Sequence, residues 1–122
     1  MSGSDWFSLL ALSHGLFYVV TGVWPLLSID SFQRVTGPKT DLWLVRTVGA
    51  VLAVVGAAIA VAAAGDSPAP EVLVLAIGST LTLTAIDIYY VSRKVIPPIY
   101  LLDAAIELAL AAAWIGVAIT TG

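Results

Sequence analysis

Four long apolar segments constrain this chain more than any other feature of its sequence. They cover residues 6–27, 42–64, 71–92 and 98–120, separated by three short polar connections. A helix of about twenty residues rises about 30 Å, which matches the hydrocarbon core of a bilayer. Because no water is available there to the backbone, each segment is expected to be a helix. The sequence therefore predicts an all-α membrane protein, in which residues 1–122 form one antiparallel four-transmembrane-helix bundle.

Composition agrees with this assignment and excludes several classes of function. Hydrophobic residues make up 60% of the chain and charged residues 11%, against about 25% charged residues in a typical soluble domain. The absence of cysteine rules out thiolate metal sites, and a single histidine, His14, rules out a multi-histidine metal site. Five basic residues are too few to form a nucleic-acid-binding surface. Since no catalytic or nucleotide motif is visible either, we expect no enzyme, cofactor or metal.

Prolines and turn residues mark the connections between the four segments. In the first connection, apolar residues recur every three positions and Ser28 or Asp30 can cap a helix, which predicts a short interfacial helix. Pro70 and Pro98 are expected to open the third and fourth long helices, because proline suits a first helical position. Pro25 is expected to kink or end the first long helix.

All basic residues fall on one side of the predicted bundle. The first connection and the residues just after it hold three of them, and the third connection holds two: Arg34, Lys39, Arg46, Arg93 and Lys94. Because Lys and Arg favour cytoplasmic loops, we expect the first and third connections in the cytoplasm and both termini outside the plasma membrane. Trp6 and Trp114 are expected in the outer belt of interfacial aromatic residues.

Small residues predict how the helices pack, since lipid provides little hydrophobic drive between them. Such residues recur on one face of the first, second and fourth long helices: Gly15 and Gly22; Gly49, Ala53 and Gly56; Ala104, Ala105, Ala109, Ala112 and Gly116. We interpret these stripes as intramolecular packing surfaces, with a dedicated homodimer face as the alternative.

Five ionisable residues lie inside the apolar segments, where each costs a few kcal/mol. Arg46, Asp87 and Asp103 share a depth of roughly 7–9 Å from the cytoplasmic boundary, so Arg46 is expected to bind one or both acids. Glu107 lies one turn deeper than Asp103 on the same helix face, and His14 lies near the middle of the membrane. Because one arginine cannot neutralise three acids, the deepest of them, Glu107, is expected to be protonated.

Hydroxyl groups near this cluster can line a small polar cavity between the helices. Thr80 and Thr84 share a helix face with Asp87, and Tyr18 and Thr21 lie on the His14 side of the first helix. Threonine hydroxyls can equally bond back to their own helix, and a polar cluster can serve only to fix the order of the helices.

Two stretches resemble segments of known proteins. Residues 35–49, VTGPKTDLWLVRTVG, and residues 96–107, IPPIYLLDAAIE, resemble segments of small, uncharacterised bacterial four-helix membrane proteins. Size and helix count are also similar to the DoxX-like group. The resemblance implies a four-helix membrane fold and no established activity. It draws attention to Arg46, Asp103 and Glu107, which lie inside the two stretches.

Three functions remain open. The first is a binding or accessory protein with a polar pocket around Glu107 for a small or lipid-like molecule within the bilayer. The second is a proton-coupled transporter or proton path through Asp87, Asp103, Glu107 and His14, which with so few spans would require a homodimer. The third is a structural membrane subunit. Binding ranks first and transport second.

Overall fold

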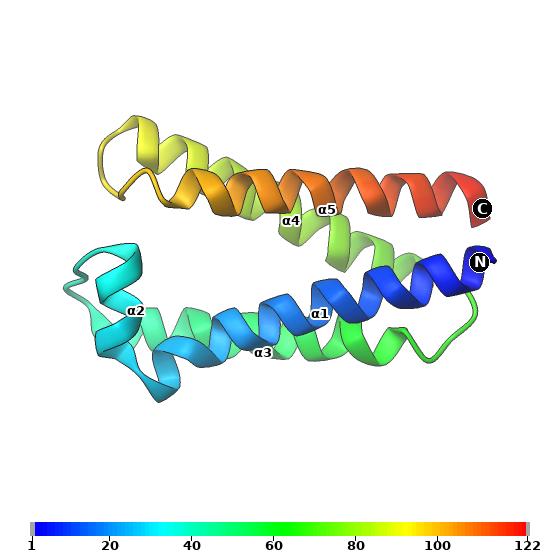
Figure 1. The fold of residues 1–122 in the computed structure, drawn as a ribbon, viewed down its shortest axis with the longest axis horizontal. Coiled ribbons are helices and arrows are strands. Elements are labelled where there is room, and N and C mark those ends of the chain that lie inside the picture. Colours follow the sequence, from blue (N-terminus) through cyan, green and yellow to red (C-terminus); the bar gives the residue numbers. More distant parts are fainter. Residues whose placement is uncertain (1, 122) are drawn as a thin grey trace.

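The computed structural model describes residues 2–121, and four of its helices are long and apolar enough to cross a membrane. The helices are α1 Gly3–Leu27, α2 Ile29–Thr36, α3 Leu42–Ala62, α4 Pro70–Ser92 and α5 Tyr100–Thr121. Both ends of the described chain lie at one end of the molecule with the α3–α4 connection, and the other two connections lie at the opposite end (Figure 1). The predicted all-α four-helix bundle is confirmed, and it is compatible with a small integral membrane protein.

The short helix α2 confirms the prediction for the first connection. Ser28 caps it by accepting a hydrogen bond from the backbone N–H of Ser31. The Trp24 indole N–H donates to the Ser31 hydroxyl at 2.9 Å, and its ring packs edge-on against Phe32. These contacts fasten α2 to the end of α1.

The three prolines behave differently from one another. Pro70 is the first residue of α4, as predicted. The prediction for Pro98 is wrong, because its carbonyl and that of Pro97 accept the first backbone hydrogen bonds of α5, which begins at Tyr100. Pro25 lies inside α1, which continues to Leu27, and it is buried.

The tightest packing in the molecule joins α1 and α3 through glycines. Gly15 lies opposite Gly56 and Gly22 opposite Gly49, so the antiparallel helices meet at two points seven residues apart. A Cβ on Gly15 would lie 2.6 Å from the backbone nitrogen of Ala60, which leaves room only for hydrogen. The small-residue stripes of the first two long helices are therefore an intramolecular packing surface, as predicted.

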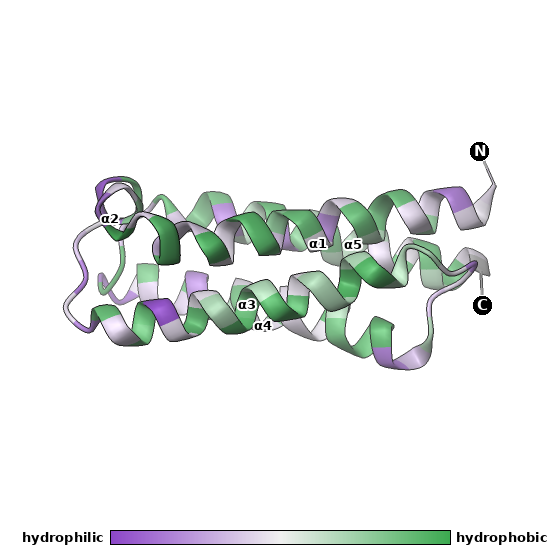
Figure 2. Cartoon of the chain, turned by 90° about the horizontal axis from the view of Figure 1, so that it is seen from below, coloured by the Kyte–Doolittle hydropathy of each residue, from purple (hydrophilic) through white to green (hydrophobic). Residues whose placement is uncertain are grey.

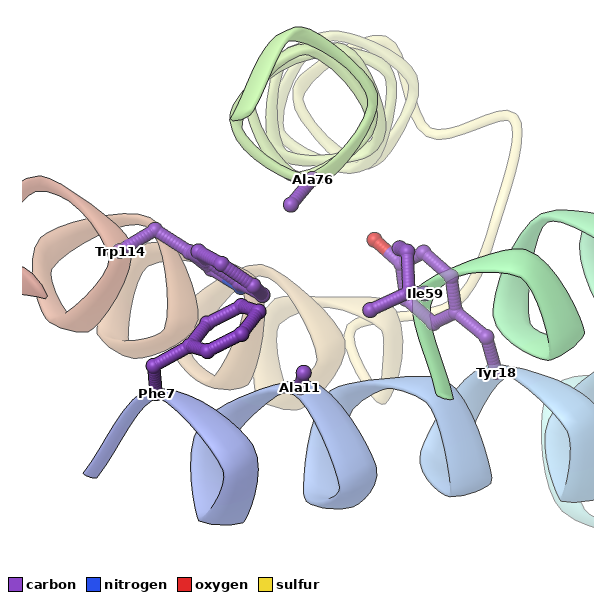
Figure 3. Packing of buried hydrophobic residues seen from close by; sticks show 6 residues of the cluster. All are labelled: Phe7, Ala11, Tyr18, Ile59, Ala76 and Trp114. Carbon is purple, nitrogen blue, oxygen red and sulfur yellow. The ribbon is translucent and has the colours of Figure 1, made fainter. Parts of the chain in front are cut away.

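The second pair of helices, α4 and α5, packs together and meets the first pair mainly through α1 and α5, whereas α3 and α4 make few contacts. A cluster of buried side chains lies between the pairs (Figure 3). It consists of Phe7, Ala11, Tyr18, Ile59, Ala76 and Trp114. The predicted small-residue stripe of α5 is only partly correct: Ala104 is buried, whereas Ala105, Ala109, Ala112 and Gly116 are exposed.

The outer surface of the four long helices is apolar. Val54 and Val74 are 70% and 75% exposed, for example, which suits contact with lipid chains rather than with water. Figure 2 shows hydrophobic residues along the long helices and hydrophilic residues gathered at α2 and at the connections. This pattern makes the few polar side chains in the interior the residues that need a functional or structural explanation.

Candidate functional site: a polar cluster inside the bundle

His14 is fully buried in the middle of α1 and binds to a residue of α5. The Trp114 indole N–H donates to His14 Nδ1 at 2.9 Å, and both side chains have no exposed surface. Because an indole nitrogen can only donate, Nδ1 must carry no proton, so a neutral His14 has its proton on Nε2. That second nitrogen is buried and has no hydrogen-bond partner. The imidazole is thus held in one tautomer with an unused N–H.

Tyr18, one turn along α1 from His14, carries the polar contacts from α1 to the carboxyl groups. Its hydroxyl donates to Glu107 Oε1 at 2.6 Å, and its ring lies edge-on to the His14 ring with centroids 4.3 Å apart. Ser79 of α4 lies near the same hydroxyl, but its own O–H donates to the backbone carbonyl of Ala76 at 3.1 Å. The hydroxyl of Tyr18 therefore joins α1 to α5 in the interior of the molecule.

Three carboxyl groups meet next to this tyrosine. Asp103 lies close to both Asp87 and Glu107. Asp87 and Glu107 are 4% and 1% exposed, while Asp103 is half-buried in the first turn of α5. Since a carboxylate has no donor, two carboxyl groups can hydrogen-bond to each other only if at least one keeps its proton. One oxygen of Asp87, Oδ2, is buried without a partner.

Arg46 does not belong to this cluster. Its side chain is exposed, and it forms no ion pair with any residue of the part of the chain that the structure describes. The predicted contact with Asp87 or Asp103 is wrong. The prediction used only the position of each residue along the membrane normal, which does not determine the direction in which a side chain points from its helix. From its position on α3 the long side chain can reach the polar boundary directly. Among residues 2–121, the three acids form no ion pair with any basic side chain.

Two threonines of α4, Thr80 and Thr84, are buried, but their hydroxyls bond to their own helix. Thr80 donates to the carbonyl of Ile77 at 2.9 Å, and Thr84 donates to the carbonyl of Thr80 at 2.7 Å. Thr21 is half-buried on α1. Thr80 and Thr84 thus lie on the expected face while their hydroxyls take part in local bonds.

Trp114 is the member of the site that sequence reasoning missed. Trp114 is not an interfacial residue but a fully buried one, with Phe7 packed against it at a centroid distance of 6.0 Å. One signal in the sequence was available: Trp114 follows Glu107 by seven residues, which places both on one face of a helix. Ser79 of α4 lies nearby but bonds to its own helix, through the backbone carbonyl of Ala76.

Two cavities open on the surface of the bundle, and neither is lined by Glu107, Asp87 or His14. One of about 390 Å³ lies between the first and third connections. The other, of about 340 Å³, is a groove between α3 and α4. No group of three acid or histidine side chains with the spacing of a metal site occurs among the described residues.

Comparisons with protein-family models, curated proteins and solved structures find no match for this chain. The likeness to DoxX-like proteins therefore stays a prediction. Any function has to be inferred from the cluster itself, whose distinctive property is its surplus of carboxyl groups.

Proposed function

We propose that this chain is an integral membrane protein that takes up and releases protons at the cluster of Asp87, Asp103 and Glu107, as part of a proton-coupled transport or binding cycle. One observation carries the proposal: three neighbouring carboxyl groups lie in the bundle, and none of them forms an ion pair with a basic residue of the described part of the chain. Like charges this close cannot all persist in a low dielectric, so the group must hold protons that it can exchange.

The two other candidate functions fit these contacts less well. A ligand pocket around Glu107 would require space there, but Glu107 is 1% exposed and Tyr18 already binds its Oε1 atom. A purely structural cluster would be expected to satisfy its members, since a buried polar atom without a partner costs about 1–3 kcal/mol. Asp87 Oδ2 and His14 Nε2 are both buried and unsatisfied. Such atoms suit groups that gain and lose protons.

The polar cluster is open toward the end of the molecule that carries the first and third connections. Asp103 is half-buried in the first turn of α5, next to the third connection and its basic residues. Toward the other end, Phe7 and Trp114 are fully buried and their rings pack edge-on against each other. We infer that protons reach the cluster from the side of these connections. By the distribution of Lys and Arg, this side is the cytoplasmic face of a plasma-membrane protein.

Infrared titration and proton flux test the proposal together. The purified chain is placed in liposomes, its protonated-carboxyl band is followed against pH, and proton entry is followed with an enclosed dye. Glu107→Gln should fold, because the amide preserves the size and most hydrogen bonds of a protonated carboxyl. This variant should lose part of the protonated-carboxyl infrared band and the coupled proton flux. Glu71→Gln, at an exposed position outside the cluster, is the matched control.

The proposal fails if every carboxyl group of the wild-type protein titrates like an exposed acid. It fails equally if Glu107→Gln and Glu71→Gln leave the same infrared band and the same flux as the wild type.

A further inference from the structure

His14 lies along α1 between the carboxyl groups and the buried aromatic rings at the opposite end of the interior. Its ring contacts Tyr18 edge-on, and the Tyr18 hydroxyl donates to Glu107 at 2.6 Å. The indole N–H of Trp114 donates to His14 Nδ1 at 2.9 Å, and Phe7 packs against that indole. Figure 3 shows Phe7 and Trp114 together on one side of the buried cluster and Tyr18 on the other. His14 therefore connects the carboxyl groups to the aromatic end of the interior.

The lone pair of His14 Nδ1 can bind one hydrogen atom at a time. In the structure it accepts the indole N–H of Trp114, and an indole nitrogen can donate but never accept. A histidine that has taken up a proton carries N–H groups on both nitrogens and has no lone pair left for an indole. A proton and the Trp114 indole therefore compete for the same atom, and the indole binds only the neutral ring.

We propose that Trp114 is a positioning residue that controls the passage of protons through His14, between the carboxyl groups and the end of the bundle opposite the first and third connections. The inference rests on the proposed function and adds a gate to it. While the indole N–H occupies Nδ1, His14 stays neutral and passes no proton. The buried N–H at Nε2, which has no hydrogen-bond partner, is the proton that the ring can release.

The transfer through the ring balances without any other reactant. When the indole turns away, an incoming proton forms an N–H bond at Nδ1, and the ring becomes a cation with two N–H groups. The N–H bond at Nε2 then breaks, and that proton leaves on the other side of the ring. One bond has formed and one has broken, so His14 is neutral again with its proton on Nδ1.

The titratable side chains of the interior stabilise the cationic ring once the indole has left. They come from α1, α4 and α5, and apart from His14 they are phenolic or acidic: Tyr18, Asp87, Asp103 and Glu107. The buried residues of α3, which are Gly49, Gly56 and Ile59, have no titratable side chain. Because acidic groups near a cation favour its charged form, the indole is the group that keeps His14 neutral at rest.

The hydrogen bond between Trp114 and His14 crosses from one helix pair to the other. Glycines interlock α1 with α3, whereas α1 and α5 share a smaller contact. The side chains of Ala11 and Ala76 lie in the same buried cluster as the indole, and both are small (Figure 3). A small separation of the two pairs therefore breaks this hydrogen bond before it disturbs the packing within either pair.

The presence of a single histidine makes the test direct, because a label on histidine reports on His14 alone. The full chain is prepared with nitrogen-15 on both imidazole nitrogens, and solid-state NMR in liposomes is recorded from about pH 5 to about pH 8, the range in which histidines usually titrate. In the wild type we expect a protonated Nε2 and an Nδ1 that only accepts a hydrogen bond, at every pH. Trp114→Phe should show the two-proton cation at the acidic end, because Nδ1 has lost the donor that binds only the neutral ring.

Trp6→Phe is the matched control, because it removes an indole that is 55% exposed and lies outside the buried cluster. It should give the wild-type nitrogen signals. Trp114→Phe should also speed proton entry into liposomes, and adding His14→Gln should abolish that increase. A purely structural role of Trp114 would lower stability without changing which nitrogen of His14 carries the proton.

A wild-type spectrum with a proton on Nδ1 would overturn the inference, and this measurement does not depend on the folding of any variant. A Trp114→Phe spectrum that matches the wild type at every pH would overturn it as well. Either result leaves the proposed function intact as long as the infrared band of the carboxyl groups still titrates. If that band does not titrate, the proposed function fails by its own measurement, whatever the His14 signals show.

Discussion

Gly22→Ala tests the close contact between α1 and α3 with a single methyl group. A Cβ at Gly22 would lie 2.7 Å from the backbone nitrogen of Ala53 and closer still to the carbonyl oxygen of Gly49. Both are backbone atoms of α3, so no side chain can rotate out of the way. The two helices must instead move apart over the whole stretch between their glycine contacts.

The size of the effect follows from two opposing contributions. Overpacking of this kind costs about 1–3 kcal/mol, and a clash with backbone belongs at the upper end of that range. Alanine gains up to about 1 kcal/mol over glycine in helix propensity. We therefore expect Gly22→Ala to lower the free energy of unfolding by about 1–2 kcal/mol. Gly78→Ala should leave it unchanged or raise it, because no atom lies within 4 Å of its Cβ position.

The measurement is the midpoint of unfolding in mixed micelles of increasing sodium dodecyl sulfate, followed by far-ultraviolet circular dichroism. Gly116→Ala is a second control on α5, again with nothing within 4 Å of the added methyl group. The reasoning is refuted if Gly22→Ala and the two control variants shift the midpoint in the same direction by the same amount.

Three further variants test the polar contacts and the topology. Tyr18→Phe should lower stability by about 1–3 kcal/mol, because it removes the donor to Glu107, and the same micelle titration measures this loss. Trp114→Phe should destabilise by a similar amount, about 1–3 kcal/mol, because His14 Nδ1 loses its donor; an unchanged midpoint would show that this bond contributes nothing. Ser67→Cys in oriented vesicles should react with an impermeant thiol reagent only from the outside, and labelling from the cytoplasmic side alone would reverse the proposed orientation.

The fold could be predicted closely from the sequence because the bilayer leaves few choices. The four apolar segments agree with the observed helices to within about three residues at each end, since length and the requirement for internal backbone bonds decide them. The use of Gly15 and Gly22 in packing between helices could also be predicted, because small residues allow close approach, but their partner helix α3 emerges only from the structure.

The candidate site was harder to predict because depth is a coordinate along the membrane normal only. Equal depth grouped Asp87 with Asp103, and these two acids do interact. The same criterion also added Arg46 to the group, although the side chain of Arg46 is exposed on α3. It also placed Trp114 at an interface, whereas the residue reaches inward to His14. The rotation of each helix about its axis depends on contacts between distant parts of the chain. In a uniformly apolar helix, the sequence pattern contains little information about that rotation.

The division of polar partners between the two helix pairs has a consequence for biogenesis. During synthesis the N-terminal hairpin of α1 and α3 enters the membrane first and can interlock through its glycines unaided. The later hairpin of α4 and α5 brings all three acids of the cluster, yet the hydroxyl that binds Glu107 belongs to Tyr18 of α1. A nascent chain that fails to dock its second hairpin leaves carboxyl groups facing lipid. Membrane quality-control proteases can recognise such a defect before the protein accumulates.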